Sequence, residues 1–140
     1  MRLDRIRIVL VNTTHPGNIG ATARAMANMG LDRLYLVAPQ TFPSGEATVR
    51  AAGADHLLER ATVCESLDDA VADCGLVIGT TARQRSVGWV EFSPKAVMAK
   101  VRERVLTDQI AFVFGQEASG LTNSELERCQ YHVRIPVEEG

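Results

Sequence analysis

The stretch that decides the fold is NTTHPGNIGATARAMANMG, residues 12–30, which follows the short apolar run Ile6–Val11. A buried strand, a glycine-containing turn and an amphipathic helix together are typical of one unit of a parallel α/β sheet. We expect the helix to begin at Gly17 or Asn18 and to end at Gly30, a common glycine stop. Spacing of i, i+3, i+4 and i+7 predicts a buried stripe made by Ile19, Thr22, Ala23 and Met26. Thr22 fits this stripe if its hydroxyl bonds back to a helix carbonyl.

The rest of the chain repeats this alternation of apolar, β-branched runs and helical patterns. Strands are predicted over Leu34–Val37, Leu76–Ile78, Ile110–Phe114 and Tyr131–Ile135, with a weaker one at Ala61–Cys64. One helix is predicted over Leu67–Asp73, with Ser66 as its N-cap. A second is predicted to begin at Ser93-Pro94 and to bury Val97, Met98, Val101 and Val105 on one face. A third is predicted after a capping box of Thr122 and Glu125, with Leu121 and Leu126 as the accompanying hydrophobic staple. We therefore expect an α/β fold, an open parallel sheet flanked by helices, in a single domain over residues 1–140.

Composition limits the classes of function. Hydrophobic residues make up 46% and charged residues 23% of the chain, which is ordinary for a globular domain and excludes a disordered one. Fifteen Lys and Arg against 17 Asp and Glu give a formal charge of −2, so no global positive field favours indiscriminate binding of nucleic acid. The seven aromatic residues are too few for a base-stacking platform of the usual RNA-binding kind. Any RNA contact must therefore come from a local patch or another domain.

Targeting and metal signals are absent from the sequence. The first residues lack a signal-peptide pattern, and no apolar run approaches the roughly 18 residues that span a bilayer. Cys64, Cys74 and Cys129 are widely spaced, and the three histidines are scattered. We expect a cytoplasmic protein without membrane contact, disulfide framework or metal site.

Two further small-residue segments are predicted to lie beside the first turn. FGQEASGLTNSEL, residues 114–126, follows the fourth strand, and its Gly115 and Gly120 bracket Glu117. Gly79-Thr80-Thr81 follows the third strand. Because the carboxyl ends of parallel strands meet at one edge, these loops favour a ligand approached closely by main chain. Simple turns remain the alternative, since neither G-x-G-x-x-G nor G-K-[ST] is present.

Basic side chains occur in two informative places. Arg24 lies about 140° around its helix from Ile19, so we expect it to project away from the sheet, toward solvent or a partner. Arg83, Arg85 and Trp89 share one segment, where they would suit a phosphate backbone and a stacked base. A mobile polar loop is the alternative for that segment.

HPGNIGATARAMANMG and FGQEASGL resemble the first two signature motifs of the SpoU branch of the SPOUT methyltransferases, and Ile135-Pro136 resembles the start of the third. The resemblance covers essentially the whole chain. It implies an α/β sheet whose C-terminal part is threaded into a trefoil knot, with S-adenosylmethionine as the methyl donor and no metal. It also implies methylation of a ribose 2′-OH in tRNA, at the nucleotide that opens the anticodon loop.

The resemblance also implies roles for individual residues. Arg24 matches the catalytic arginine, Asn18 helps to organise the loop of the first motif, and Glu117 belongs to the catalytic and binding loop. The donor pocket is implied at Gly79, Thr80, Thr81, Gly115 and Ile135. Family members are homodimers with active sites at the subunit interface, which would explain why Arg24 faces away from its own sheet.

The third motif of the family continues past Ile135-Pro136, whereas this chain stops at Gly140. We therefore expect a SPOUT methyltransferase domain over 1–140 that is incomplete at its C-terminus, with the knot truncated or incomplete. Two other readings stay open: 2′-O-methylation of ribosomal RNA by the same chemistry, and a non-catalytic module for RNA binding or dimerisation.

Overall fold

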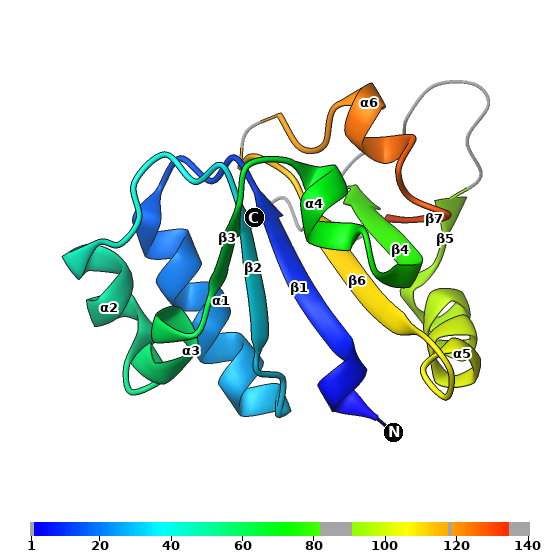
Figure 1. Ribbon diagram of the computed structural model, residues 1–140, viewed down its shortest axis with the longest axis horizontal. Helices are drawn as coiled ribbons and strands as arrows, with labels where there is room; N and C mark the ends of the chain where they lie inside the picture. The colour runs from blue at the N-terminus through cyan, green and yellow to red at the C-terminus, as the bar shows by residue number, and fades with distance from the viewer. Residues whose placement is uncertain (1, 82–90, 118, 135–140) are drawn as a thin grey trace, which may run out of the picture.

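The computed structural model describes residues 2–81, 91–117 and 119–134, and within them it forms a seven-stranded sheet (Figure 1). The strands lie in the order β3-β2-β1-β6-β4-β7-β5, and all neighbouring pairs are parallel. Their bounds are β1 Ile6–Val11, β2 Arg33–Val37, β3 Thr62–Cys64, β4 Cys74–Thr81, β5 Glu91–Phe92, β6 Gln109–Phe114 and β7 Tyr131–Arg134. The expected open parallel α/β sheet is confirmed.

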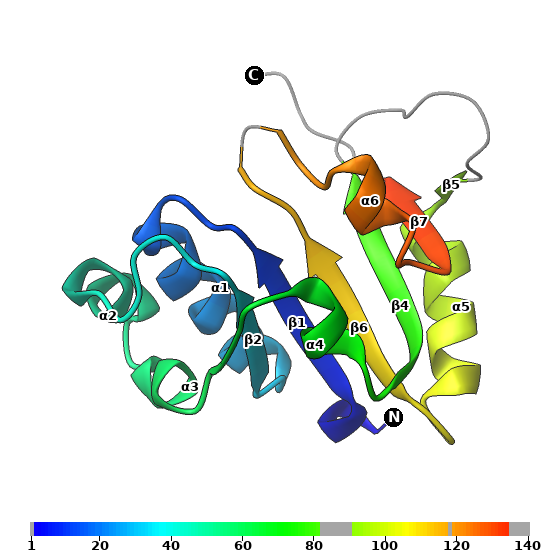
Figure 2. The same ribbon diagram turned by 45° about the horizontal axis from the view of Figure 1, so that its top comes forward.

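Helices cover both faces of this sheet, as Figure 1 and Figure 2 show. After the short 3-10 turn η1 Leu3–Arg5 they are α1 Pro16–Met29, α2 Gly45–Ala51, α3 Asp55–Glu59, α4 Leu67–Val71, α5 Pro94–Arg104 and α6 Asn123–Leu126. Side chains alternate along β1, so that Ile6, Ile8 and Leu10 pack on the face of α1 and α5. Val9 and Val11 pack on the opposite face, with α4 and α6.

Helix α1 follows the sequence prediction closely. Ile19, Ala23 and Met26 are buried, and the half-buried Thr22 donates its hydroxyl to the Asn18 carbonyl over 2.8 Å, as expected. Gly30 ends the helix in the left-handed region with φ 79°. The predicted start was slightly wrong: His15 is the N-cap and Pro16 the first helical residue. Proline suits that position because its fixed φ is already helical and its missing N–H has no partner there.

The other predicted helix starts are confirmed. Ser66 caps α4, Ser93 caps α5, and Thr122 forms the capping box of α6 with Glu125. Helix α4 stops at Val71, however, rather than at Asp73. Asp73 instead accepts two hydrogen bonds, of 2.8 and 2.9 Å, from the buried guanidinium of Arg7 in β1.

Besides η1, two helices and one strand were not predicted from the sequence. Helices α2 and α3 have seven and five residues, and each buries only two side chains. So few buried positions do not establish a helical period. Strand β5 has only two residues, and its pairing with β7 defines it rather than any apolar pattern of its own.

Close contact between α1 and α2 depends on Gly20. A Cβ atom there would overlap the Ala47 carbonyl oxygen and lie 2.9 Å from the Arg50 Cβ. We expect Gly20→Ala to lower the free energy of unfolding by about 1–3 kcal/mol, because the two helix backbones must separate. Urea unfolding would measure this, with Gly45→Ala as the control, since nothing lies within 4 Å of a Cβ at Gly45. Equal stability of the two variants would contradict the prediction.

Candidate functional site

The start of α1 is tied to the loop after β6 by one carboxylate. Glu117 accepts hydrogen bonds from the Thr14 N–H (3.1 Å), the Thr14 hydroxyl (3.1 Å), the His15 N–H (2.8 Å) and the Asn18 side-chain amide (3.1 Å). We call these four residues the Glu117 clamp. The clamp joins the first two sequence motifs, which lie about a hundred residues apart in the chain.

The clamp follows from the sheet topology. Strands β1 and β6 are neighbours, with Leu10 in register with Phe114, so the loops that follow them leave the sheet side by side. The loop after β1 runs straight into α1, whose first N–H groups have no partner within the helix. Glu117 accepts from the N–H groups of Thr14 and His15, which come just before the first helical residue Pro16, and its charge interacts favourably with the helix dipole.

The clamp strongly favours the ionised form of Glu117. Partial burial by itself raises the pKa of this carboxyl group, but the hydrogen bonds from His15, Thr14 and the Asn18 amide outweigh it and lower the pKa from 4.5 to about 2. At neutral pH the carboxylate is therefore a weak base whose lone pairs are already used. The geometry suits it to holding two loops together.

Arg24 is exposed on α1, as the helical arithmetic predicted. Its side chain has no hydrogen-bond or ion-pair partner within the part of the chain that the structure describes. Arg24 and Asn18 are six residues apart, which corresponds to about 9 Å along the helix axis and about 120° around it. The structure thus brings Asn18 and Glu117 together but directs Arg24 to another side of α1.

The expected small-residue loop at Gly79, Thr80 and Thr81 is part of strand β4. These residues pair in register with His132, Val133 and Arg134 of β7. The prediction of a loop was wrong because the apolar run ends at Ile78, whereas β-branched threonines continue the strand against β7. Thr80 and Thr81 are buried at the carboxyl edge, and Thr80 donates its hydroxyl to the Val113 carbonyl over 3.0 Å.

Gly115 and Gly79 are tightly packed by the protein itself. A Cβ at Gly115 would overlap the backbone of Gly120 and Leu121, so this loop closes on itself. A Cβ at Gly79 would lie 2.8 Å from the Cys129 Sγ, beneath α6. Both glycines therefore set the shape of the carboxyl edge beside the Glu117 clamp.

Four predicted site residues lie outside the described residues: Ile135, Arg83, Arg85 and Trp89. Two members of the clamp, Thr14 and His15, were missed from the sequence. Thr14 donates hydrogen bonds to Glu117 from both its N–H and its hydroxyl. Its position between the end of the first strand and the N-cap of the helix was the sequence feature that could have indicated it.

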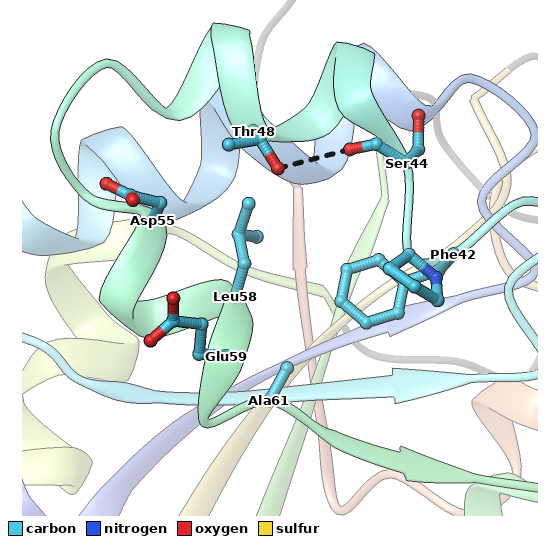
Figure 3. A pocket seen from close by; sticks show the side chains of 8 residues that line it. Phe42, Ser44, Thr48, Asp55, Leu58, Glu59 and Ala61 are labelled. Atoms are coloured by element: carbon cyan, nitrogen blue, oxygen red, sulfur yellow. Dashed lines mark hydrogen bonds between the residues drawn. The ribbon is translucent and has the colours of Figure 1, made fainter.

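A separate pocket of about 330 Å³ lies on the flank of the molecule between α2 and α3 (Figure 3). Phe42, Leu58 and Ala61 give it an apolar lining, and Asp55 and Glu59 place two carboxylates one helical turn apart beside it. A polyanion such as RNA would be repelled there. The pocket shares no residue with the Glu117 clamp.

Metal-binding and membrane features can be assessed over the described residues. Within these ranges no three His, Cys, Asp or Glu side chains gather as a metal site would require. None of the described helices combines the length and apolar character needed to cross a bilayer. Cys64, Cys74 and Cys129 are free thiols in this structure.

Comparisons with known proteins converge on one group. The model of the SpoU rRNA methylase family matches residues 5–140. The tRNA (cytidine/uridine/adenosine-2′-O-)-methyltransferase TrmJ of Pseudomonas aeruginosa (strain UCBPP-PA14) is 51% identical over 97% of this chain and 53% of its own length. TrmJ of Photorhabdus laumondii is 48% identical over 96% of this chain and 56% of its own length. The chain thus spans about half the length of the curated relatives it matches.

Solved structures agree with the sequence comparisons. A probable methylase family protein from Haemophilus influenzae Rd KW20 superposes with a TM-score of 0.89 at 46% identity, covering 97% of this chain and 57% of that one. TrmJ from Z. mobilis ZM4 gives 0.88 at 36% identity, over 94% and 58%. The SpoU methyltransferase AviRb from Streptomyces viridochromogenes, in complex with AdoMet, gives 0.68 at 19% identity over 95% and 49%, a likeness of fold alone.

Proposed function

The chain belongs to the SpoU methylase family, and on that premise we propose that it transfers a methyl group from S-adenosylmethionine to a ribose 2′-OH of tRNA. The observation that carries the proposal is the Glu117 clamp, which joins the two family motifs at one sheet edge. The curated relatives at 47–51% identity are named tRNA 2′-O-methyltransferases, which supports tRNA as the substrate. We further propose the nucleotide that opens the anticodon loop as the target, and the cytoplasm as the compartment.

The carboxyl edge of β4, β6 and β7 suits a methyl donor contacted largely by main chain. Thr80 and Thr81 are buried there, and Gly115 and Gly120 fold the adjoining loop back on itself. Ligands of parallel α/β sheets bind at such edges. Gly79, Thr80, Thr81, Gly115 and Ile135 are the residues we assign to the donor. When bound, S-adenosylmethionine supplies an electrophilic methyl group on its sulfonium.

The protein must then align the ribose and favour loss of its hydroxyl proton. Holding the reacting atoms in line contributes about 7–11 kcal/mol in well-oriented systems. We propose that Arg24 stabilises the developing oxyanion, and its guanidinium is also suited to binding the adjacent phosphate. A guanidinium group is a poor proton acceptor because it stays protonated in proteins. A phosphate oxygen or water is therefore the better acceptor.

We propose that the active form is a homodimer with each site at the subunit interface. Arg24 and the Glu117 clamp of one chain lie on different sides of α1, so a second copy would let Arg24 of one subunit meet the clamp of the other. A groove of about 300 Å³ supports this arrangement, since α1 and the sheet line it with Ile8, Leu10, Thr22, Ala25, Met26, Met29 and Phe114.

Met29 offers a direct test of the dimer. Its side chain is 60% exposed at the groove, although methionine is ordinarily buried. We expect Met29→Glu to weaken self-association at least about 100-fold, because a carboxylate would be desolvated in an apolar interface. Sedimentation equilibrium would measure the change, with Val49→Glu on α2 as a matched exposed control. Loss of dimer in both variants, or in neither, would contradict the proposed interface.

The function itself is tested by transfer of labelled methyl from S-adenosylmethionine to unmodified tRNA transcripts, using the full natural protein. Label on a ribose at the start of the anticodon loop supports the proposal. Label on ribosomal RNA alone would keep the chemistry and replace the substrate, as the family description allows. A gel shift with tRNA but no calorimetric signal with the donor would instead indicate a non-catalytic module.

A further inference from the structure

The carboxyl edge of the sheet is acidic at the end formed by β3, β2 and β1. A pocket of about 260 Å³ opens there, above Val11 and Val37, between the segment after β3 and helix α6, and its lining includes Glu65, Asp68, Glu125 and Arg128. Arg128 is already paired with Asp68 over 2.7 Å, so its charge is compensated. Glu65 and Glu125 leave this end with net negative charge. We call these four charged residues the acidic pocket.

Two exposed cations lie at the opposite end of the same edge, among the residues that the structure describes. Arg134 is the last residue of β7 and pairs in register with Thr81, at the end of β4. Lys95 lies in the first turn of α5, three residues after the end of β5. Both side chains are exposed, and neither forms a side-chain hydrogen bond or ion pair over the ranges that the structure covers. We call Arg134 and Lys95 the basic end.

The proposed site for methyl transfer lies between these two ends. In the order β3-β2-β1-β6-β4-β7-β5, the Glu117 clamp belongs to β1 and β6, and Thr80 and Thr81 belong to β4. Figure 1 shows β3 on one side of these central strands and β7 and β5 on the other. A polyanion at the centre of the edge is therefore attracted to one side and repelled from the other.

We propose that the RNA substrate leaves the site over the basic end, with Arg134 and Lys95 binding its phosphates while the acidic pocket excludes it from the β3 end. This inference rests on the proposed function, and it deepens that function by naming where the RNA backbone lies. Phosphate contacts fix the orientation of an RNA without reading its sequence. The two cations therefore act as positioning residues, which would explain how a chain of net charge −2 holds a polyanion.

Salt dependence of tRNA binding tests the proposal in the full natural protein. Each phosphate contact contributes about 0.7–0.9 to the slope of log K against log salt concentration. We expect Arg134→Gln and Lys95→Gln each to reduce that slope by this amount and to weaken binding about three- to tenfold at low salt. Donor affinity and melting temperature should stay unchanged, which a merely structural role would not predict.

Two controls complete the experiment. Arg60→Gln removes an exposed arginine beside the start of β3, at the amino edge of the sheet, and we expect wild-type slope and affinity. Glu65→Gln should tighten binding about twofold, because it removes a repulsive charge. Methyl transfer to RNA with wild-type slopes in Arg134→Gln and Lys95→Gln would overturn this inference alone. A protein that neither transfers methyl nor binds RNA would overturn the proposed function as well.

Discussion

Replacing Arg24 with alanine is expected to lower methyl transfer to tRNA by about 10²–10³-fold, with little effect on donor affinity. This magnitude is typical for the loss of one preorganised donor at a developing oxyanion. Arg24 is exposed and forms no side-chain hydrogen bond or ion pair among the described residues, so the variant should fold normally. Single-turnover transfer of labelled methyl, with a melting curve beside it, would measure both quantities.

Arg24→Lys separates two roles of the side chain. A lysine keeps the charge but loses the planar fork that binds a phosphate through two parallel hydrogen bonds. We expect this variant to remain at least about tenfold below wild type. Arg50→Ala, which removes an exposed arginine from α2, is the matched control. Near-normal turnover of Arg24→Ala would contradict the assignment of this residue.

The sequence predicted most of the sheet because its strands are continuous apolar runs and its main helices carry recognisable caps. Thr22 illustrates this agreement, since its hydroxyl bond to the Asn18 carbonyl follows from the helical stripe alone. The meeting of the two motif loops was also predictable, because parallel strands place their carboxyl ends at one edge. Helical arithmetic likewise predicted the exposure of Arg24.

Tertiary pairing decided what the sequence left open. Thr80 and Thr81 belong to a strand because β7 pairs with them, and β7 comes about fifty residues later in the chain. Thr14 belongs to the site because its hydroxyl donates a hydrogen bond to Glu117 from a different loop, a contact that no local sequence pattern encodes. Short helices such as α2 bury too few side chains to show a period, so only packing against α1 reveals them.

The Glu117 clamp gives the second large expected effect. Glu117→Gln should lower the turnover number for methyl transfer by about 10–100-fold, because an amide offers one acceptor oxygen where the carboxylate offers two. In one orientation the Gln NH₂ group would face the Thr14 N–H, and in the other it would face the Thr14 hydroxyl, the His15 N–H and the Asn18 amide. Either orientation places two hydrogen-bond donors against each other. Hydrogen exchange at the backbone amides of Thr14 and His15 should be faster in Glu117→Gln than in wild type. Glu127→Gln, which alters an exposed carboxylate just after α6, is the control.

The pH dependence distinguishes holding a loop from accepting a proton. Because the pKa of Glu117 is about 2 in the folded protein and ordinarily 4.5, its ionised form stabilises the clamp fully above about pH 4.5. That contribution declines as the pH falls from about 4.5 toward 2. A positioning role therefore predicts that Glu117→Gln lowers the rate equally at every pH from 5 to 9. An acid limb within this range, present in wild type but absent from Glu117→Gln, would contradict the low pKa and show that this carboxylate takes the proton.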